Sequence, residues 1–548
     1  MASLLPILAI LGASASASAS VIPSNPSPQP PTTVLISSSS PAEIDLSSCL
    51  HAAYFGTYGG SRASQDHIYI PSEECLNGAA NLLDGIASGS LVPLQQEQNQ
   101  DADVRGGSKL VWVGQAGVDP SLLSLELAVQ SMGDSWNIIS SRSAEYALLH
   151  SRMTREEASA EAQAQIVLSS SGSTRAIGAI KLLHQSASSL LLHVPSAYLP
   201  MIDTFLPSHL VPVALPSKPF PSSQSASIST SVTAQEGWEP VPTKFAKNLA
   251  NITKHLEFSP EIDRIVSDGI ELNQIRRDVR WLTGEAPSGI QSRHSFTPGA
   301  VKAAHWIKDK VSATGANCTL SPFLPGFAPN VICHYPSKSN ATTSSGQEHV
   351  ILSAHYDSRG SFGSTRAPGG DDDGSGSGHL LAVAHAIGTQ GVKFDKSVTL
   401  AFFSGEEQGL LGSHAYAEYL HGTNATVLLQ IQADMLAYHV PGEPLQLGLP
   451  ESIHLPEASY LLGNLSQLYS PELLIGKTAA CCSDHQSFLS YGFPATAAFE
   501  RNGWIADPFY HNSGDLSQRE GYDFEQVVSI AKVTLASLLT VAGYTVVN

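Results

Sequence analysis

The C-terminal half of the sequence predicts an α/β fold with a mostly parallel central sheet flanked by helices. The apolar runs that predict its strands lie at residues 350–352, 398–403, 427–431 and 495–499. Each run is apolar throughout and does not alternate with polar residues, which is typical of parallel strands buried on both faces. Helical patterns follow them, at residues 380–388, 410–420, 460–468 and 486–491. This βαβ rhythm predicts a sheet that gathers ligands beyond the carboxyl ends of its strands.

A separate mixed α/β domain is expected before this sheet, over residues 42–215. Strand-like runs occur there at residues 110–113 and 189–192, with helical stretches between such runs, but the segment contains no chemical motif. The Ser/Pro-rich residues 216–240 have little periodicity and are interpreted as a linker. The C-terminal domain is therefore assigned residues 241–548.

The first residues are typical of a secretion signal. A short apolar run at residues 4–11 precedes alternating Ala and Ser at residues 13–20, so residues 1–20 are predicted to be a signal peptide. The Pro- and Ser-rich residues 21–41 that follow predict a flexible leader. Because no other window reaches about 18 uninterrupted apolar residues, a membrane span is not expected. The protein is expected to be secreted and extracellular.

Glycosylation sequons support the secretory route. Asn-x-Ser/Thr triplets lie at Asn251, Asn317, Asn340, Asn424 and Asn464. Each is a common accident alone, but together with a signal peptide they predict N-linked glycans.

Six cysteines predict disulfides in a secreted chain. Proximity favours pairing Cys49 with Cys75 and Cys318 with Cys333. Cys481 and Cys482 are adjacent, and for them a vicinal disulfide and two free buried thiols both remain open. No pair has C-x-x-C spacing, so a cysteine zinc site is not expected.

The charge balance excludes one class of partner. The 548 residues include 29 Lys and Arg against 48 Asp and Glu, a formal net charge of −19. A nucleic-acid binder needs a basic face to displace counterions from phosphates, so no nucleic-acid partner is expected. Only 14% of the residues are charged, which also argues against long disorder and against a coiled coil.

Metal-ligating residue types follow the predicted strands at several points. His355 and Asp357 come directly after the run at 350–352, in the segment SAHYDS. In extended chain they face the same way, and a carboxylate beside a histidine suits a partner that fixes the imidazole tautomer. Asp372 lies in a glycine-flanked carboxylate cluster, PGGDDDGSG, that opens a helix.

The remaining candidates lie in the same kind of position. Glu406 and Glu407 follow the run at 398–403, Asp434 follows the next run, and His511 lies in a loop after the last strand. Two histidines and three carboxylates without cysteine suit zinc, whereas calcium and magnesium prefer all-oxygen sites. A single such residue carries little weight, but joint placement beyond buried strands predicts a metal site.

These segments resemble a known family. SAHYDS, PGGDDDGSG, FFSGEEQGLLGS, QADM, CSDHQSF and YHNSGD are similar to the motifs of the zinc aminopeptidases of metallopeptidase family 28. The family also includes glutamate carboxypeptidase and, more distantly, glutaminyl cyclase and the transferrin receptor. The resemblance covers about residues 245–548 and implies the zinc-peptidase fold for that part, but it does not reach residues 42–215.

The resemblance implies two zinc ions bridged by one carboxylate. That bridge would be Asp372, the first Asp of the family's D-x-x-S-G signature. His355 and Asp434 would hold one zinc ion. Glu407 and His511 would hold the other.

The resemblance also implies catalytic roles beside the metals. Glu406 matches the general base, and Asp357 matches the partner that orients the first histidine ligand. The triplet Ser483–His485 matches a motif outside the ligand set. Secreted relatives often pair the cysteine before this triplet with one four residues upstream, where this chain has Thr478, and that leaves the local disulfide open.

The activity implied is removal of N-terminal residues from peptides by a zinc exopeptidase. A carboxypeptidase stays open as an alternative, since Arg359, Arg366 and Arg501 lie near the motifs and could bind a terminal carboxylate. Glutaminyl cyclases use a single zinc with a reduced ligand set, and receptor-like ectodomains lose ligands, so the full set here argues against both. Residues 42–215 could be a propeptide, a lid or a binding module.

Overall fold

A computed structural model describes most of the chain. The described residues are 33–38, 44, 49–59, 65–78, 89–94, 108–122, 131–164, 179–216, 240–338 and 348–547. The predicted signal peptide lies outside them, as do most of the predicted leader and nearly all of the predicted linker.

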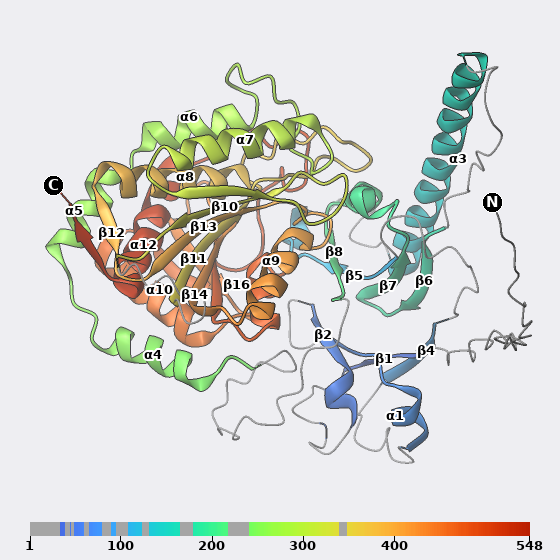
Figure 1. The fold of residues 1–548 in the computed structure, drawn as a ribbon, viewed down its shortest axis with the longest axis horizontal. Helices are drawn as coiled ribbons and strands as arrows, with labels where there is room; N and C mark the ends of the chain where they lie inside the picture. Colours follow the sequence, from blue (N-terminus) through green and yellow to red (C-terminus); the bar gives the residue numbers. More distant parts are fainter. Residues whose placement is uncertain are drawn as a thin grey trace, which may run out of the picture.

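The C-terminal domain is built on a six-stranded sheet with the order β17-β14-β11-β13-β10-β9. Its strands are β9 (Asn317–Ser321), β10 (Asn330–Tyr335), β11 (Glu348–His355), β13 (Ser397–Phe403), β14 (Thr426–Ala433) and β17 (Ala495–Ala498). The four strands from β17 to β13 pair in parallel, and β10 and β9 add an antiparallel edge. The predicted mostly parallel sheet is confirmed (Figure 1).

Helices cover this sheet and bury its strands. They are α4 (Thr243–Lys254), α5 (Pro260–Gly269), α6 (Leu272–Leu282), α7 (Pro298–Ser312), α8 (Gly374–Thr389), α9 (Leu411–Gly422), α10 (Pro456–Tyr469), α11 (His485–Ser490) and α12 (Phe524–Ala542). Helices α8 and α12 pack on the central strands and on each other, and both are buried along most of their length. Strands buried on both faces explain the uninterrupted apolar runs.

Helix α12 is apolar for this reason. By length and composition alone it could cross a membrane, but 83% of its most apolar window is buried inside the protein. Buried core helices pass the same test. Two two-stranded sheets are also present in this domain. One is formed by β12 (Val392–Phe394) with β18 (Tyr544–Val546), and the other by β15 (Gln446–Pro450) with β16 (Leu474–Thr478).

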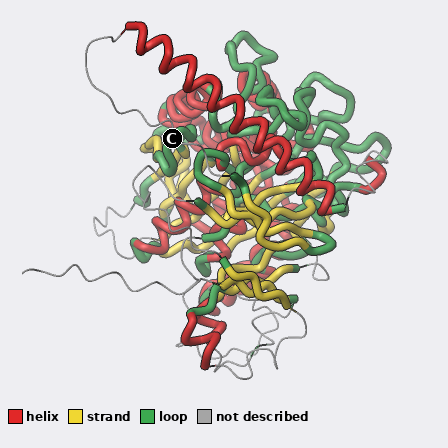
Figure 2. The backbone as a smooth tube through the Cα atoms, turned by 90° about the vertical axis from the view of Figure 1, so that its right-hand side faces the viewer, coloured by secondary structure: helices red, strands yellow, loops and turns green. Residues whose placement is uncertain are grey.

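The N-terminal region, meaning the described residues from 33 to 216, forms two small antiparallel sheets. One has the order β2-β3-β1-β4 and the other β6-β7-β5-β8. The strands are β1 (Thr33–Ser37), β2 (Tyr54–Tyr58), β3 (Asp66–Tyr69), β4 (Gly89–Pro93), β5 (Lys109–Gln115), β6 (Lys181–Gln185), β7 (Ser189–Val194) and β8 (Leu210–Ala214). The helical elements are α1 (Glu73–Gly78), the long α3 (Met132–Ala164), and the 3-10 turns η2 (Cys49–Ala53), η4 (Pro120–Leu122) and η5 (Leu199–Phe205). Figure 2 shows α3 as a single long helix.

One boundary differs from the sequence-based expectation. Residues 33–37 were assigned to the flexible leader on composition, but they form β1, which pairs with both β3 and β4. Their sequence, TVLIS, is apolar and rich in β-branched residues, and Val34 and Leu35 are fully buried. The leader therefore ends before Thr33, and the N-terminal sheet begins there.

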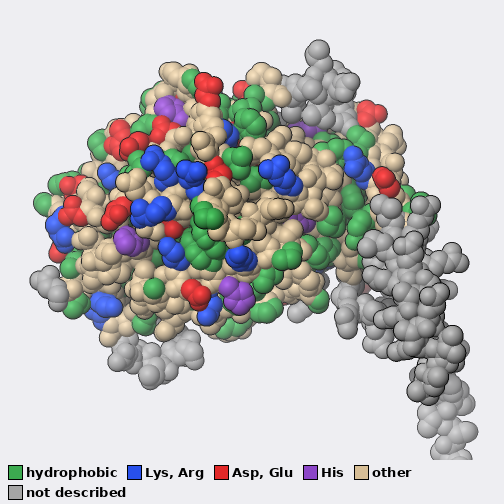
Figure 3. Space-filling model, turned by 90° about the horizontal axis from the view of Figure 1, so that it is seen from above, with side chains coloured by type: hydrophobic (Ala, Val, Ile, Leu, Met, Phe, Trp, Pro, Cys, Tyr) green, Lys and Arg blue, Asp and Glu red, His purple; other side chains and the backbone are tan. Residues whose placement is uncertain are grey.

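The disulfides confirm the two pairings that proximity favours. Cys49–Cys75 and Cys318–Cys333 are joined, and the open question at Cys481–Cys482 is answered by a vicinal disulfide. Four sequon asparagines, Asn251, Asn317, Asn424 and Asn464, are exposed, and Asn340 lies outside the described residues. Figure 3 shows Lys and Arg side chains lying among Asp and Glu on one face.

Candidate metal centre

The candidate ligands meet at the carboxyl edge of the parallel sheet. His355 is the last residue of β11, and Asp434 directly follows β14. Glu407 lies in the turn that follows β13, whose last residue, Phe403, is in register with His355. Parallel strands bring their carboxyl ends to one edge, so residues far apart in sequence converge there. His511 comes to the same place from the loop between β17 and α12.

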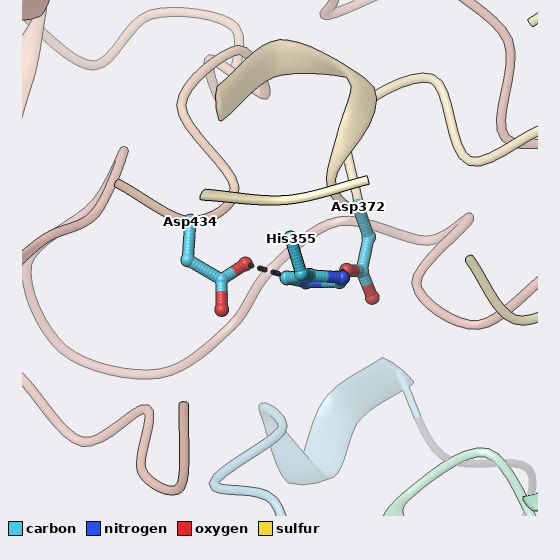
Figure 4. A group of neighbouring side chains, drawn as sticks. All are labelled: His355, Asp372 and Asp434. Atoms are coloured by element: carbon cyan, nitrogen blue, oxygen red, sulfur yellow. Dashed lines mark ion pairs between the residues drawn. The ribbon is translucent and has the colours of Figure 1, made fainter. Parts of the chain in front are cut away.

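Asp372 lies between two histidines and faces both. Its Oδ1 is 3.2 Å from Nε2 of His355, and its Oδ2 is 3.3 Å from Nε2 of His511. Asp434 Oδ1 is 3.5 Å from the same nitrogen of His355, and Glu407 Oε2 is 3.2 Å from that of His511. The two groups of possible metal ligands are thus His355–Asp372–Asp434 and Asp372–Glu407–His511. Figure 4 shows His355 lying between the two aspartates of the first group.

All three residues of the Asp371–Asp373 run have separate tasks. Asp371 accepts from the backbone N–H of Ala437 at 2.8 Å, which ties the run to the loop after β14. Asp373 accepts from the N–H of His355 at 3.1 Å and caps α8 through the N–H of Gly376. Asp372 is left to face the histidines. A triple Asp run is usually a solvated turn, but this one is buried throughout.

Two residues that sequence reasoning did not select hold this run in place. Asp515 accepts hydrogen bonds from the N–H groups of Asp371 and Asp372, at 3.0 Å each. Arg293, which is fully buried, donates to the carbonyls of Tyr356, Pro368 and Gly369. Asp515 belongs to the quoted segment YHNSGD, so its position was visible in the sequence, but its contacts were not.

Gly369 allows the close approach that this loop requires. Its φ is +54°, and a Cβ built there would lie 2.4 Å from the carbonyl oxygen of Asp372. A side chain at this position would push against the residue that faces both histidines.

Asp357 connects the first histidine to the turn that carries the glutamates. Its Oδ1 lies 3.5 Å from Nδ1 of His355, and its Oδ2 accepts from the hydroxyl of Ser295 at 2.8 Å. The N–H groups of Glu406 and Glu407 also point at it, at 3.4 Å each. One buried carboxylate thereby orients an imidazole and a turn together.

The electrostatics of the cluster favour a bound cation. Burial alone would lower the pKa of His355, but the carboxylates of Glu406 and Asp434 outweigh it and raise that pKa well above its usual value. For His511, burial again acts downward, and Glu407 is the largest influence that raises its pKa. A field that draws a proton onto both imidazoles also attracts a metal ion.

The donor atoms fit zinc. On each side, the Nε2 of a histidine and two carboxylate oxygens converge, and all are acceptors when the imidazole is neutral. Oε1 of Glu407 is buried without a hydrogen-bond partner among the described residues. Convergent acceptors of nitrogen and oxygen type repel one another unless a cation lies between them, and this ligand mixture is typical of zinc.

Glu406 lies beside the ligands without being in either group. It is half-buried, between the turn residue Gly405 and Glu407. Burial raises the pKa of Glu406 well above its usual value, and the neighbouring carboxylates of Glu407 and Asp484 raise it further. His355 acts in the opposite direction and lowers it, but does not outweigh them. Asp484, from the SDH triplet, is buried and accepts from the amide of Gln432 at 3.0 Å, and burial raises its pKa to about 7.

Comparisons with known proteins show which family this part of the chain resembles. Residues 330–535 match the model of Peptidase family M28. Leucine aminopeptidase 1 of Phaeosphaeria nodorum is 27% identical over 282 residues, which are 48% of this chain and 70% of that protein. Leucine aminopeptidase 1 of Emericella nidulans is 25% identical over 324 residues, 56% of this chain and 79% of that protein.

A solved structure shows the same fold. The LapA aminopeptidase of Legionella pneumophila matches with a TM-score of 0.52 at 17% identity, over 69% of this chain and 96% of its own. Together these findings confirm the resemblance drawn from the motifs. Residues 330–535 carry the Peptidase family M28 match, and the chain, which resembles the M28 aminopeptidases, is a metallopeptidase.

Proposed function

We propose that this chain is a secreted aminopeptidase that holds two zinc ions and removes the N-terminal residue from peptides. The observation that carries the proposal is the position of Asp372, whose two oxygens each face a different histidine, at 3.2 and 3.3 Å. A carboxylate in that position belongs to both candidate ligand groups at once. A single-metal site would have no use for the second histidine and its glutamate.

The five ligand side chains divide the work of holding the metals. His355 and Asp434 would hold one ion, Glu407 and His511 the other, and Asp372 both. Bound zinc supplies Lewis-acid chemistry, which polarises a peptide carbonyl and lowers the pKa of water. All five ligands are at most 6% exposed, so charges act there with little screening by bulk water.

Glu406 is the proposed general base. It adjoins the ligand Glu407 but stands outside both ligand groups, so its carboxylate is available to take a proton from the attacking water. A carboxylate whose pKa is raised holds that proton better and can pass it to the departing amine. Asp357 contributes by keeping His355 and the Glu406–Glu407 turn in one orientation.

The surroundings favour an amino-terminal substrate over a carboxyl-terminal one. A carboxypeptidase needs an available cation for the substrate carboxylate. Of the three arginines near the motifs, Arg359 is bound to three backbone carbonyls, and Arg501 donates to both oxygens of Glu443, at 2.7 and 3.0 Å. Arg366 is exposed, so it is the one of the three left open to a substrate carboxylate. Several carboxylates gather around the ligands, and a negative field favours the ammonium group of a peptide N-terminus.

The exposed sequon asparagines and the three disulfides support passage through the secretory route. The assignment of residues 1–20 to a signal peptide remains a prediction. N-terminal sequencing of the secreted protein checks it.

Paired substrates and a chelator test the activity. Amino-acyl anilides should be hydrolysed, their N-acetylated counterparts should not, and removal of metal should abolish turnover, which added zinc restores. Metal analysis of the purified protein should give two zinc ions per chain. Hydrolysis of the acetylated anilides alone, or of neither, contradicts the proposal.

A further inference from the structure

A backbone carbonyl of the N-terminal region contacts one of the proposed metal ligands. Nδ1 of His511 lies 2.8 Å from the carbonyl oxygen of Ser208. The other ring nitrogen, Nε2, faces Asp372 and Glu407. Nη1 of Arg359 lies 2.9 Å from the same Nδ1. A histidine that offers Nε2 to a metal carries its proton on Nδ1, and of these two neighbours only the carbonyl of Ser208 can accept it.

The turn that presents this carbonyl is held by one arginine of the C-terminal domain. Nη2 of Arg359 donates to the carbonyls of Leu206 and Pro207, at 2.7 and 3.1 Å, and Nη1 donates to that of Leu210 at 2.9 Å. These residues bracket Ser208, and we call residues 206–210 the 206–210 turn. Arg359 is 3% exposed, so its charge depends on these carbonyls for compensation.

His511 itself needs external support. Its φ is +51°, in the left-handed region that residues other than glycine rarely adopt. Such a conformation is strained and persists only where the surroundings hold it. Tyr510 stacks on the ring at 3.7 Å between ring centroids, and the carbonyl of Ser208 and Nη1 of Arg359 both contact Nδ1.

The 206–210 turn is fixed to the C-terminal domain from its other side as well. Asp203 and His294 form an ion pair at 3.0 Å, with both side chains fully buried. The N–H of Gly363 donates to the carbonyl of Thr204 at 3.1 Å. Leu410 of the C-terminal domain belongs to the same apolar cluster as residues of both N-terminal sheets. These contacts mix buried charge, backbone bonds and apolar packing, as in the interior of one folded unit.

We infer that the 206–210 turn is a permanent part of the metal centre and that Arg359 is a positioning residue, which acts on His511 both directly, with its Nη1 2.9 Å from Nδ1, and through the turn that presents the carbonyl of Ser208. The inference builds on the proposed two-zinc site. It makes the N-terminal region a part of the active enzyme. A cut in the linker would leave the N-terminal region bound to the C-terminal domain. Removal of the N-terminal region would release the metal that His511 holds.

A cobalt titration of Arg359→Met tests the positioning role, with the visible absorption of Co²⁺ as the readout in place of activity. Loss of the Arg359 contacts should lower the affinity for one of the two cobalt ions about 10- to 100-fold, as is typical when a ligand's supporting contact is removed. The affinity for the other cobalt ion should stay nearly unchanged. Arg359→Lys, which keeps a donor, should fall between.

Arg142→Met is the matched control. Arg142 lies at the same interface, with its guanidinium 4.4 Å from the ring centroid of Phe362, but it does not contact the 206–210 turn. Its cobalt titration should equal that of the wild-type protein. Equal titrations of Arg359→Met and wild type overturn the inference. A wild-type protein that binds fewer than two cobalt ions overturns the proposed function instead.

A cut in the linker provides a test if Arg359→Met fails to fold. A protease site is inserted between residues 225 and 230, and the full chain is folded, loaded with cobalt and then cleaved. The two fragments should elute together in size-exclusion chromatography, with both cobalt ions and an unchanged spectrum. Separation of the fragments with both cobalt ions retained on the larger one overturns the inference.

Discussion

The C-terminal domain and the N-terminal region contribute to the metal centre in different ways. The C-terminal domain supplies side chains with strong chemical identity, two histidines and three carboxylates, from strand ends and loops. The N-terminal region supplies a backbone carbonyl, that of Ser208, and its buried carboxylate Asp203 joins it to His294 of the C-terminal domain. The identity of the candidate ligands therefore comes from side chains of the C-terminal domain. The orientation of one of them, His511, also depends on the packing of the N-terminal region against that domain.

Changes in the two regions should therefore have different effects. Substitutions among the C-terminal side chains should act on turnover or on metal affinity and leave the fold intact. Substitutions at the contacts of the N-terminal region should act first on stability. The predictions below test this division.

The largest effect is expected for Glu406→Gln. The variant should keep both zinc ions, because Glu406 belongs to neither ligand group, and should lose about 10²- to 10⁴-fold in kcat, the usual contribution of a general base. Steady-state kinetics with an amino-acyl anilide, alongside metal analysis, measures both quantities. Glu418→Gln, on the exposed side of α9, is the control. A variant at Glu406 with wild-type kcat would mean that another group takes the proton.

Asp203→Ala tests the contact between the regions. Breaking a fully buried ion pair typically costs about 3–5 kcal/mol of unfolding free energy, and the loss should be seen in urea denaturation. The kcat of the molecules that remain folded should change far less than in Glu406→Gln. Asp309→Ala, an exposed position on α7, should stay within about 0.5 kcal/mol of the wild type.

The same pair predicts a pH dependence. Asp203 outweighs burial and raises the pKa of His294, while the pKa of Asp203 is lowered, since His294 and Arg359 outweigh burial there. A histidine whose pKa is raised in the folded protein stabilises the fold fully at pH values below its unfolded pKa of about 6.5. An aspartate whose pKa is lowered stabilises the fold fully at pH values above its unfolded pKa of about 3.9. The stability gap between wild type and Asp203→Ala should therefore be largest near pH 5–6. It should shrink as the pH rises through the raised pKa of His294. A gap that grows above pH 7 contradicts this account.

Asp357→Asn should have a smaller effect, on metal affinity. The amide can still accept from Ser295, but it loses the charge that orients His355 across 3.5 Å. Zinc affinity should fall about 10- to 100-fold, as for other partners of metal-bound histidines. Competition with a chromogenic chelator measures the change. Wild-type affinity in this variant would show that the backbone alone orients His355.

Sequence reasoning brought the candidate ligands together because their signals were local. Apolar runs marked the strands, and His355, Glu407 and Asp434 followed them directly, so a parallel topology was enough to bring them together. The tasks of Asp371 and Asp373 were not visible, because a run of three aspartates has the same letters in a solvated turn as in a buried one. The antiparallel edge formed by β9 and β10 was also missed.

The role of the N-terminal region could not be seen in the sequence for a physical reason. Every residue has a carbonyl, so nothing in the letters at 206–210 distinguishes one that contacts a metal ligand. The sequence suggests Arg359 only as a possible carboxylate binder, whereas in the structure it contacts three carbonyls and Nδ1 of His511. The composition of residues 21–41 predicts a flexible leader because most of them are Ser, Pro or polar, although the five residues of β1 form a strand.

The smallest effect on stability is expected for substitutions at the sequons, which occur in the C-terminal domain and not in the predicted N-terminal domain. All five lie at or beyond Asn251, so the predicted N-terminal domain, residues 42–215, carries no sequon. Asn464, exposed on α10, is a suitable test position. Asn464→Gln should remove the mass of one glycan from the secreted protein, as seen by intact-mass spectrometry. Its unfolding free energy should change by less than about 0.5 kcal/mol, since an exposed polar side chain is replaced by its homologue. An unchanged mass would mean that this sequon carries no sugar and would weaken the secretory assignment, while a large loss of stability would mean that the sugar supports the fold.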